Sequence, residues 1–261
     1  MATLTVFTYN LRTDVPEDGI NSFQNRRDFI RARFPAYQAD LIGFQETEPH
    51  MRQWLMEAFP EYEVCGTGRE AALDGESNVI AYRRSLFDLV SLDTFWLSDT
   101  PYVPGSRFST DQSLCPRICT CITLCHKETG KLLRHYNTHL DHEGAMAQAQ
   151  GISLVLNRMA ADYARWQAPV ILTGDFNVVP ESPVYRSVQG FSGCGKPLVD
   201  VTAGVGDTFH NFEPQNPAEQ MKIDYIFTNL PCDPKKTVKA TDEQNGQYLS
   251  DHYPVGAYLA F

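Results

Sequence analysis

The stretch Val170-Ile-Leu-Thr-Gly174-Asp175-Phe-Asn177 is an apolar run that ends in an acid and an amide. Its length and its aliphatic residues predict a buried strand, Val170–Gly174, with the polar residues at its end. Taken alone, Gly-Asp-Phe-Asn is typical of an ordinary turn. Four further apolar strands, however, carry acids, amides or histidines at one end, at Tyr9-Asn10, Gln45-Glu46, Asn137-Thr-His139 and Ser250-Asp251-His252. Because an unpaired polar group in a core costs several kcal/mol, we expect these strand ends to meet at one rim.

Working outward from this strand, the chain contains many strands and few long helices. The strands are predicted at Leu4–Leu11, Leu41–Glu46, Asn78–Arg83, Phe87–Phe95, Arg117–His126, Leu132–Leu140, Asp224–Thr228 and Tyr253–Leu259. Helical spacing predicts helices at Ser22–Tyr37, with Ser22 as the cap, at Glu48–Phe59 and at Gly144–Trp166. This pattern favours two packed sheets flanked by helices. Since no linker or repeat divides the chain, residues 1–261 are predicted to form one domain.

The composition indicates a soluble globular protein with an acidic surface. The chain has 261 residues, of which 43 % are hydrophobic, and its formal net charge is −10. Such a charge repels a long nucleic-acid duplex but does not disfavour a small phosphorylated substrate drawn to a bound cation. The start, Met1–Thr8, is predicted to be a strand and not a signal peptide, and no run approaches 18 apolar residues. We therefore expect a cytoplasmic protein without membrane contact.

Four of the seven cysteines lie close together, at Cys115, Cys119, Cys121 and Cys125. In one continuous strand these odd-numbered positions would point to the same face. A zinc site normally takes ligands from two converging elements, so we interpret these residues as reduced core thiols.

The strand-end residues predict a site for a hard metal ion. Acids and amides without a ligating thiolate suit Mg²⁺ or Mn²⁺. Asp251 and His252 are neighbours on a strand and point to opposite faces, so a different acid must orient the imidazole. Asp224, which opens the strand Asp224–Thr228, is the natural candidate. A carboxylate on the histidine Nδ1 would fix the tautomer and favour the imidazolium form.

The same residues carry a family resemblance that extends from residue 8 to residue 254. In chain order, the chain resembles the endonuclease/exonuclease/phosphatase (deoxyribonuclease-I-like) superfamily in the motifs Thr8-Tyr-Asn10-Leu-Arg12, Phe44-Gln-Glu46, Asn137-Thr-His139-Leu-Asp141-His142, Gly174-Asp175-Phe-Asn177, Ile223-Asp224-Tyr-Ile and Ser250-Asp251-His252-Tyr-Pro254. The resemblance implies a four-layer α/β sandwich, in which two mainly antiparallel sheets pack face to face with helices outside. It also implies Mg²⁺-dependent hydrolysis of a phosphate ester.

The resemblance further assigns roles by position. Asn10 and Glu46 would hold the metal, and Asp251 would lie near it. The catalytic set would be Asp175, which orients or deprotonates the attacking water, Asn177 beside it on the phosphate, His139 facing the scissile phosphate, and His252 supported by Asp224.

Other positions would contact the substrate. The segments Phe95-Trp-Leu-Ser98 and Pro116-Arg117 are similar to bacterial members of the deadenylase-like and sugar-phosphate phosphatase branches. Arg117 could offer a bidentate fork to phosphate or could be a surface arginine at a strand end. Asn78, at a strand mouth with Glu76, and His142 complete the predicted substrate set. His210 could lie at the pocket rim or be structural.

We expect the substrate to be a small phosphorylated metabolite such as a sugar phosphate. Nuclease or deadenylase-like activity on short single strands is the alternative, since stacking of bases on aromatic side chains needs little net charge. A third possibility is an inactive member that acts as a binding protein. The presence of every core residue of the motifs disfavours it.

Overall fold

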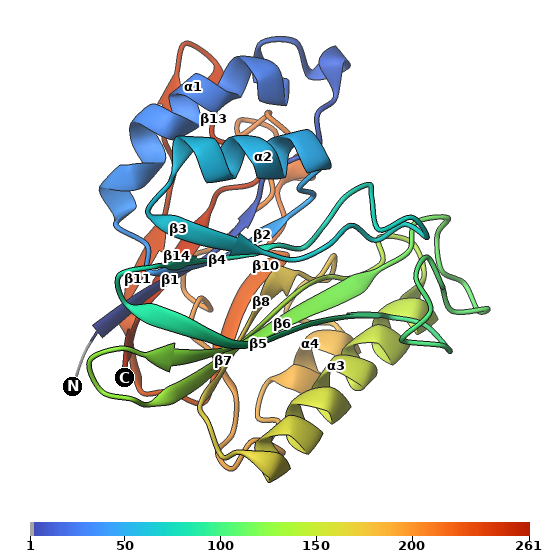
Figure 1. Cartoon of the computed structure of the whole chain (residues 1–261). Coiled ribbons are helices and arrows are strands. Elements are labelled where there is room, and N and C mark those ends of the chain that lie inside the picture. Colours follow the sequence, from blue (N-terminus) through green and yellow to red (C-terminus); the bar gives the residue numbers. More distant parts are fainter. Residues whose placement is uncertain (1–2) are drawn as a thin grey trace.

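Two six-stranded sheets packed face to face form the centre of the protein in the computed structural model, which describes residues 3–261 and, of residues 233–235, the backbone alone (Figure 1). The first sheet has the order β11-β14-β1-β2-β4-β3, with β11 at Cys232–Lys239, β14 at Val255–Ala260, β1 at Thr3–Asn10, β2 at Leu41–Gln45, β4 at Ile80–Arg83 and β3 at Tyr62–Cys65. The second has the order β5-β6-β7-β8-β10-β9, with β5 at Phe87–Trp96, β6 at Ile118–His126, β7 at Leu132–His139, β8 at Val170–Asp175, β10 at Asp224–Thr228 and β9 at Val199–Asp200.

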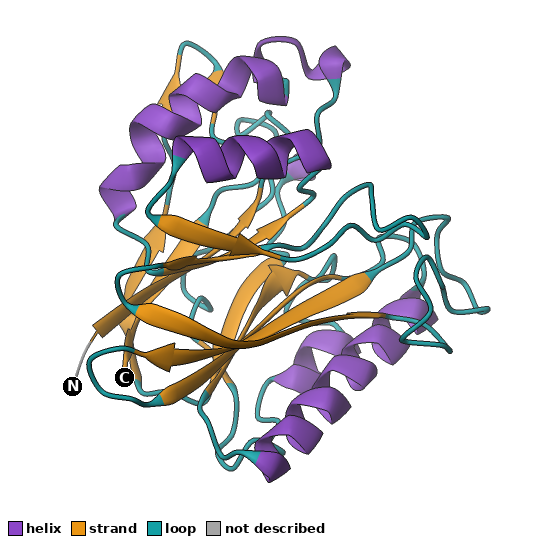
Figure 2. Ribbon diagram, viewed as in Figure 1, coloured by secondary structure: helices purple, strands orange, loops and turns teal. Residues whose placement is uncertain are grey.

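Helices cover the outer face of each sheet, as Figure 2 shows. The first sheet is covered by α1 at Phe23–Arg33 and α2 at Pro49–Ala58, and the second by α3 at Ala145–Arg165 and α4 at Pro183–Val188. Short 3-10 helices occupy Pro16–Asn21, Phe34–Tyr37 and Pro217–Glu219, and a small ribbon pairs β12 at Glu243–Gln244 with β13 at Gln247–Tyr248. The four layers of the predicted α/β sandwich are thereby confirmed. No helix within residues 3–261 combines the length and the apolar character needed to cross a bilayer.

The apolar side chains separate into three layers that follow the four-layer architecture. Phe7, Phe44 and Leu55 belong to the layer between the first sheet and its helices, whereas Val155 and Phe227 belong to the layer between the second sheet and α3. The layer between the sheets contains the residues that point the other way on the same strands, Val6, Leu41, Ile122, Leu133, Ile171 and Ile226. Strand alternation in two buried sheets accounts for this division.

The layer between the sheets becomes polar toward the end that carries the motifs. Gln45 Nε2 donates to Asn137 Oδ1 at 2.7 Å, and Thr173 Oγ1 lies 3.0 Å from the same oxygen. His135, fully buried, contacts Thr173 Oγ1 through Nε2 at 2.8 Å. The sheets approach so closely here that a Cβ atom on Gly43 would lie 2.1 Å from Thr173 Oγ1. Only glycine fits at this point of contact.

The pairing of the central strands brings the motif residues to one rim. Each sheet has a single parallel pair, β1 with β2 and β7 with β8, flanked by antiparallel neighbours on both sides. In these parallel pairs Asn10 lies opposite Gln45, and His139 lies opposite Asp175. Asp224 at the start of the antiparallel strand β10 also lies opposite Asp175. The two sheets therefore share one pairing pattern, a central parallel pair with antiparallel strands outside it.

Some local predictions require correction. The helix predicted over Ser22–Tyr37 is α-helical only to Arg33 and continues as a 3-10 turn, because Pro35 cannot donate a backbone hydrogen bond. Ser22 does occupy the N-cap, but its side chain makes no capping hydrogen bond.

The interpretation of the cysteines as reduced core thiols holds for two of the four. Cys119 and Cys121 are buried free thiols in the layer beneath α3. Cys115 precedes β6 instead of lying on it, and both Cys115 and Cys125 are half-buried free thiols.

Candidate active site

Side chains from both sheets converge at the rim where the central strands end. Asn10 ends β1 and Glu46 follows β2 in the first sheet, whereas His139 ends β7, Asp175 ends β8 and Asp224 begins β10 in the second. Asn10, His139, Asp175 and Asp224 are buried, and Glu46 is half-buried. The predicted convergence of the strand ends is therefore present.

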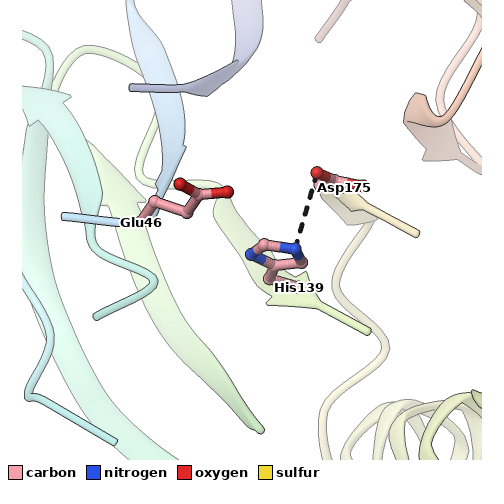
Figure 3. Close-up of side chains that lie close together, drawn as sticks. All are labelled: Glu46, His139 and Asp175. Carbon is pink, nitrogen blue, oxygen red and sulfur yellow. Dashed lines mark ion pairs between the residues drawn. The ribbon is translucent and has the colours of Figure 1, made fainter. Parts of the chain in front are cut away.

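Asp175 lies at the centre of this cluster. Its Oδ2 accepts a hydrogen bond from Asn10 Nδ2 at 3.0 Å and lies 3.5 Å from His139 Nε2 and 3.7 Å from His252 Nε2. Figure 3 shows Glu46 and Asp175 on either side of the His139 ring. Burial, and after it the charge of Asp224, raises the pKa of Asp175 above that of an ordinary aspartate. A carboxylate with a raised pKa in such a cluster can accept a proton near neutral pH.

His252 is held by the acid that the sequence pointed to. Its Nδ1 lies 2.8 Å from Asp224 Oδ2, and the ring of Phe209 packs against the imidazole with centroids 4.9 Å apart. Burial alone would lower the pKa of His252, but the charge and hydrogen bond of Asp224, with the charges of Asp251 and Asp175, raise it. The imidazole is therefore kept in its cationic form, with Nε2 directed toward Asp175.

His139 has the opposite electrostatic environment. Burial, followed by the positive charges of Arg117 and Arg69, lowers the pKa of His139, so this imidazole is neutral. Asn177 Nδ2 donates to the Leu140 carbonyl at 3.0 Å, which fixes the amide orientation, and lies 2.9 Å from His139 Nε2. The Nε2 atom of His139 is consequently an acceptor, and its proton sits on Nδ1.

Glu46 is held as an ionised carboxylate. Its Oε1 accepts from Asn10 Nδ2 at 2.8 Å, and its Oε2 accepts from the Thr13 amide at 2.9 Å. Burial acts to raise the pKa of Glu46, but these hydrogen bonds, together with the charges of His252 and Arg12, lower it. Asn10 Oδ1 accepts from the Arg12 amide at 2.9 Å, so Asn10 presents its NH₂ group to the acids.

The donor set of this cluster fits a divalent cation. Glu46, His139 and Asp175 each offer one ligand atom, and the three atoms lie within 4.8 Å of one another. Carboxylate oxygens at this density suit a hard ion such as Mg²⁺ or Mn²⁺. Of the three predicted ligands, Glu46 belongs to this group, while the amide oxygen of Asn10 is engaged elsewhere. Asp251, buried, accepts from Ser250 Oγ at 3.0 Å and lies 3.6 Å from Arg12 Nε, so its role at a metal stays a prediction.

The predicted substrate residues differ in their positions. Arg117 is 5 % exposed, so the alternative of a surface arginine is wrong. Its Nη2 donates to His142 Nδ1 at 2.7 Å, and its Nε lies 3.6 Å from Asp141 Oδ2. The side chain of His142 is 47 % exposed and accessible to a ligand. Asn78 donates to the Ile118 carbonyl at 2.8 Å across the sheets, which is a structural contact.

Sequence reasoning did not identify Arg69 as a site residue. Its guanidinium pairs with both carboxylate oxygens of Glu76 at 2.8 Å, and Trp96 Nε1 donates to its carbonyl at 2.6 Å. The charges of Arg69 and Arg117 both act on His139, and each arginine also lies beside an acid, Glu76 and Asp141 respectively. Arg69 lies in an irregular loop, where no periodicity could have revealed it.

His210 is structural. It is fully buried, stacks on Tyr253 with centroids 4.1 Å apart, and donates its backbone N–H to the Asp251 carbonyl at 2.9 Å. The proposal of a rim position is therefore excluded, and burial lowers the pKa of His210 to about 4.

Three residues at the site have left-handed backbone conformations. Arg12, Glu46 and Asn177 have φ values of 57°, 56° and 51°. Each lies one or two residues beyond a strand end. Non-glycine residues in this region carry strain of about 1–3 kcal/mol, and such strain often collects at functional sites.

Comparisons with known proteins agree with this geometry. The model of the Endonuclease/Exonuclease/phosphatase family matches residues 7–252. A member of this family from Bacteroides vulgatus is 29 % identical, with a TM-score of 0.87 and complete coverage of both chains. A mannosyl-6-phosphatase from Bacteroides thetaiotaomicron is 31 % identical over 99 % of this chain and 100 % of its own, with a TM-score of 0.83. A probable 3'-5'-exoribonuclease subunit of the CCR4-Not complex from Encephalitozoon cuniculi is 24 % identical over 99 % of this chain and 62 % of its own length. The chain thus belongs to the endonuclease/exonuclease/phosphatase family, whose members hydrolyse phosphate esters.

Proposed function

We propose that this protein is a Mg²⁺- or Mn²⁺-dependent phosphomonoesterase that acts on a small phosphorylated metabolite, such as a sugar phosphate. The observation that carries the proposal is the placement of His252, held by Asp224, beside Asp175 in a cluster whose donor atoms suit a divalent ion. The similarity to a mannosyl-6-phosphatase supports the substrate class. The net charge of −10 also favours a small substrate over a long polyanion.

Glu46 would hold the metal, and His139 and Asp175 offer ligand atoms within 4.8 Å of its carboxylate. Asp251 would lie near the metal, and Asn10 would fix the Glu46 carboxylate through its NH₂ group. When bound, the metal would supply positive charge at the phosphate oxygens. Of the predicted ligands, Glu46 is the one that belongs to a group of ligand atoms within 4.8 Å of one another.

The chain's own residues would then handle the proton and the developing charge. Asp175, with its raised pKa, would take a proton from the attacking water at Oδ2. His252 would place its Nε2–H against the phosphate, and Asp224 would keep it charged through Nδ1. Asn177 would hold the His139 ring through Nε2, which leaves the Nδ1–H of His139, unpaired among the described residues, as the donor for the phosphate. The neutral ring would add no competing charge to the metal group.

Arg117 and His142 would contact the substrate. Their hydrogen bond occupies His142 Nδ1, while Nε2 lies 3.4 Å from Glu143 Oε1 on the exposed part of the ring. Asn78 would act more indirectly, through its contact between the sheets.

Phosphodiesterase activity on short single-stranded nucleic acid is the second candidate. The similarity to an exoribonuclease subunit supports it, and the same core residues would serve both reactions. An inactive binding protein is the least supported function, because the charged cluster is complete.

A substrate panel tests these proposals. Phosphomonoesters including hexose phosphates, cyclic nucleotides and short oligonucleotides are each assayed with Mg²⁺ and with Mn²⁺. We expect kcat/KM to be highest for a sugar phosphate. Faster turnover of oligonucleotides would replace the proposal with the nuclease, and binding without turnover of any ester would establish the inactive protein.

A further inference from the structure

Arg26 is a fully buried cation behind the catalytic cluster, on the first helix. It is the largest of the fully buried side chains, although arginine is rarely buried without a specific role. It lies in α1, outside every motif that marked the site. Placing a guanidinium in this position is costly unless its donors are satisfied.

The guanidinium donates four hydrogen bonds to backbone carbonyl oxygens from three segments of the chain. Its Nε donates to Asn21 at 2.5 Å, its Nη1 to Leu249 at 2.5 Å, and its Nη2 to Leu11 at 2.8 Å and to Arg12 at 3.4 Å. Leu11 and Leu249 lie 238 positions apart in the sequence (249 − 11). One side chain therefore ties together the first and the last motif segments.

The Leu11–Arg12 segment, on one side of the guanidinium, determines the orientation of Asn10 beside the acids that would hold a metal. Leu11 and Arg12 follow Asn10 directly, and Arg12 has a left-handed backbone conformation. In that conformation its amide holds Asn10 Oδ1, which turns the NH₂ group of Asn10 toward Glu46 and Asp175. Fixing the Leu11 and Arg12 carbonyls therefore fixes the orientation of Asn10.

The segment that begins at Leu249, on the other side of the guanidinium, determines the position of His252. Leu249 immediately precedes Ser250-Asp251-His252, and its carbonyl also accepts from the Tyr9 hydroxyl at 2.8 Å. Two donors on one carbonyl leave little freedom for the start of this segment. The position of His252 relative to Asp175 then depends on the same guanidinium as the position of Asn10.

We infer that Arg26 is a positioning residue, which holds the Asn10 and the Asp251–His252 segments at the separation that the reaction needs. The inference rests on the proposed function for its kinetic consequence. Lysine cannot replace Arg26, because one ammonium has three donors at a point, whereas the guanidinium spreads five donors over a plane.

The experiment compares Arg26→Lys and Arg26→Met with a control that loses stability elsewhere. Met159→Ala serves as the control, because Met159 is fully buried in the layer between the second sheet and α3, on the opposite side of the sandwich from α1. The control must have the same melting temperature as the Arg26 variant with which it is compared. If Met159→Ala does not, another truncation in the same layer that does is used instead. All measurements are made well below the melting temperatures.

We expect kcat to fall about tenfold in Arg26→Lys and about a hundredfold in Arg26→Met, since a displacement near 1 Å costs on that order. KM should change less than threefold, and the matched control should retain kcat within twofold. Amide hydrogen exchange supplies a readout that needs no substrate. Exchange should rise at least tenfold in residues 11–13 and 249–253 relative to the control.

Each outcome supports or overturns the inference. Equal exchange and equal kcat in the Arg26 variants and the matched control would show that Arg26 only stabilises the fold. If the protein hydrolyses nothing in the panel, the proposed function fails, while the exchange comparison still decides the role of Arg26. If Arg26→Met does not fold, the comparison of Arg26→Lys with the control decides the question.

Discussion

The pairing of His252 with Asp224 permits a prediction in which the size of each effect follows from the contacts. The test consists of His252→Ala, Asp224→Asn and the double variant. In Asp224→Asn the amide oxygen can take the place of Oδ2, which accepts from His252 Nδ1 at 2.8 Å and from Thr208 Oγ1 at 2.6 Å. The NH₂ group then takes the place of Oδ1, which is buried without a hydrogen-bond partner among the described residues. The Nδ1–H of His252 keeps an acceptor, and the main loss is the negative charge.

This loss sets the expected magnitude. A hydrogen bond to a charged group contributes about 1–1.5 kcal/mol more than a neutral one, and 1.4 kcal/mol corresponds to about tenfold in rate. Asp224→Asn should therefore lower kcat about tenfold. His252→Ala removes the positioned proton-bearing group itself and should lower kcat by about 10²–10⁴-fold.

The double variant distinguishes a shared function from separate ones. If Asp224 acts only through His252, the double variant should have the kcat of His252→Ala within about threefold, because residues acting as a unit are not additive. The assay is steady-state hydrolysis of the best ester of the panel, with circular dichroism to confirm that each variant is folded at the assay temperature. If the decrease in kcat of the double variant equals the product of the two single decreases, Asp224 serves something other than His252. Near-normal kcat in His252→Ala would remove the histidine from the mechanism.

Further predictions concern the metal, the response to acid and the cysteines. EDTA should abolish turnover, and Mg²⁺ or Mn²⁺ should restore it better than Ca²⁺. Glu46→Gln should weaken metal binding as measured by calorimetry. Full activity after the metal has been removed, verified by elemental analysis, would contradict the metal dependence. Burial lowers the pKa of His135 to about 3, so the unfolded state binds more protons as pH falls from 6.5 toward 3 and the folded state loses stability over that window. Between pH 7 and pH 4.5 this residue should remove roughly 2–3 kcal/mol of unfolding free energy. Urea unfolding of His135→Gln should show a pH dependence smaller by that amount, and an unchanged dependence would refute it. A thiol-blocking mercurial should release no zinc from purified protein, since Cys119 and Cys121 lie in the apolar layer. Release of stoichiometric zinc would instead support a zinc site formed by the cysteines.

The central strands could be predicted from the sequence because they are long, apolar and bounded by polar residues. Strands β1, β2, β7, β8 and β10 all lie where the apolar runs placed them. Their polar ends also predicted one shared rim, since burial of so many unpaired groups would be too costly. The missed elements are short or polar. Strand β3 and helix α4 are too short for a periodicity to emerge, and β11 contains few apolar residues.

The fine geometry of the site depended on contacts that no strand pattern carries. The sequence indicated Asn10 at the metal, but it could not show that a left-handed Arg12 holds its oxygen and turns its NH₂ group inward. The Arg69–Glu76 pair comes from one irregular loop, and Arg26 acts through backbone carbonyls that have no sequence signature. These features depend on tertiary folding and not on local propensity.

The contact at Gly43 has a consequence for how catalysis and packing are related. The first sheet supplies Asn10 and Glu46, while the second supplies His139, Asp175 and Asp224. Thr173 and Asn137 occupy the space that a side chain at position 43 would need, so the two sheets are in direct contact at this point. This close packing helps to keep the site residues of the two sheets aligned with one another. Packing between the two sheets therefore bears on the geometry of the site as well as on stability.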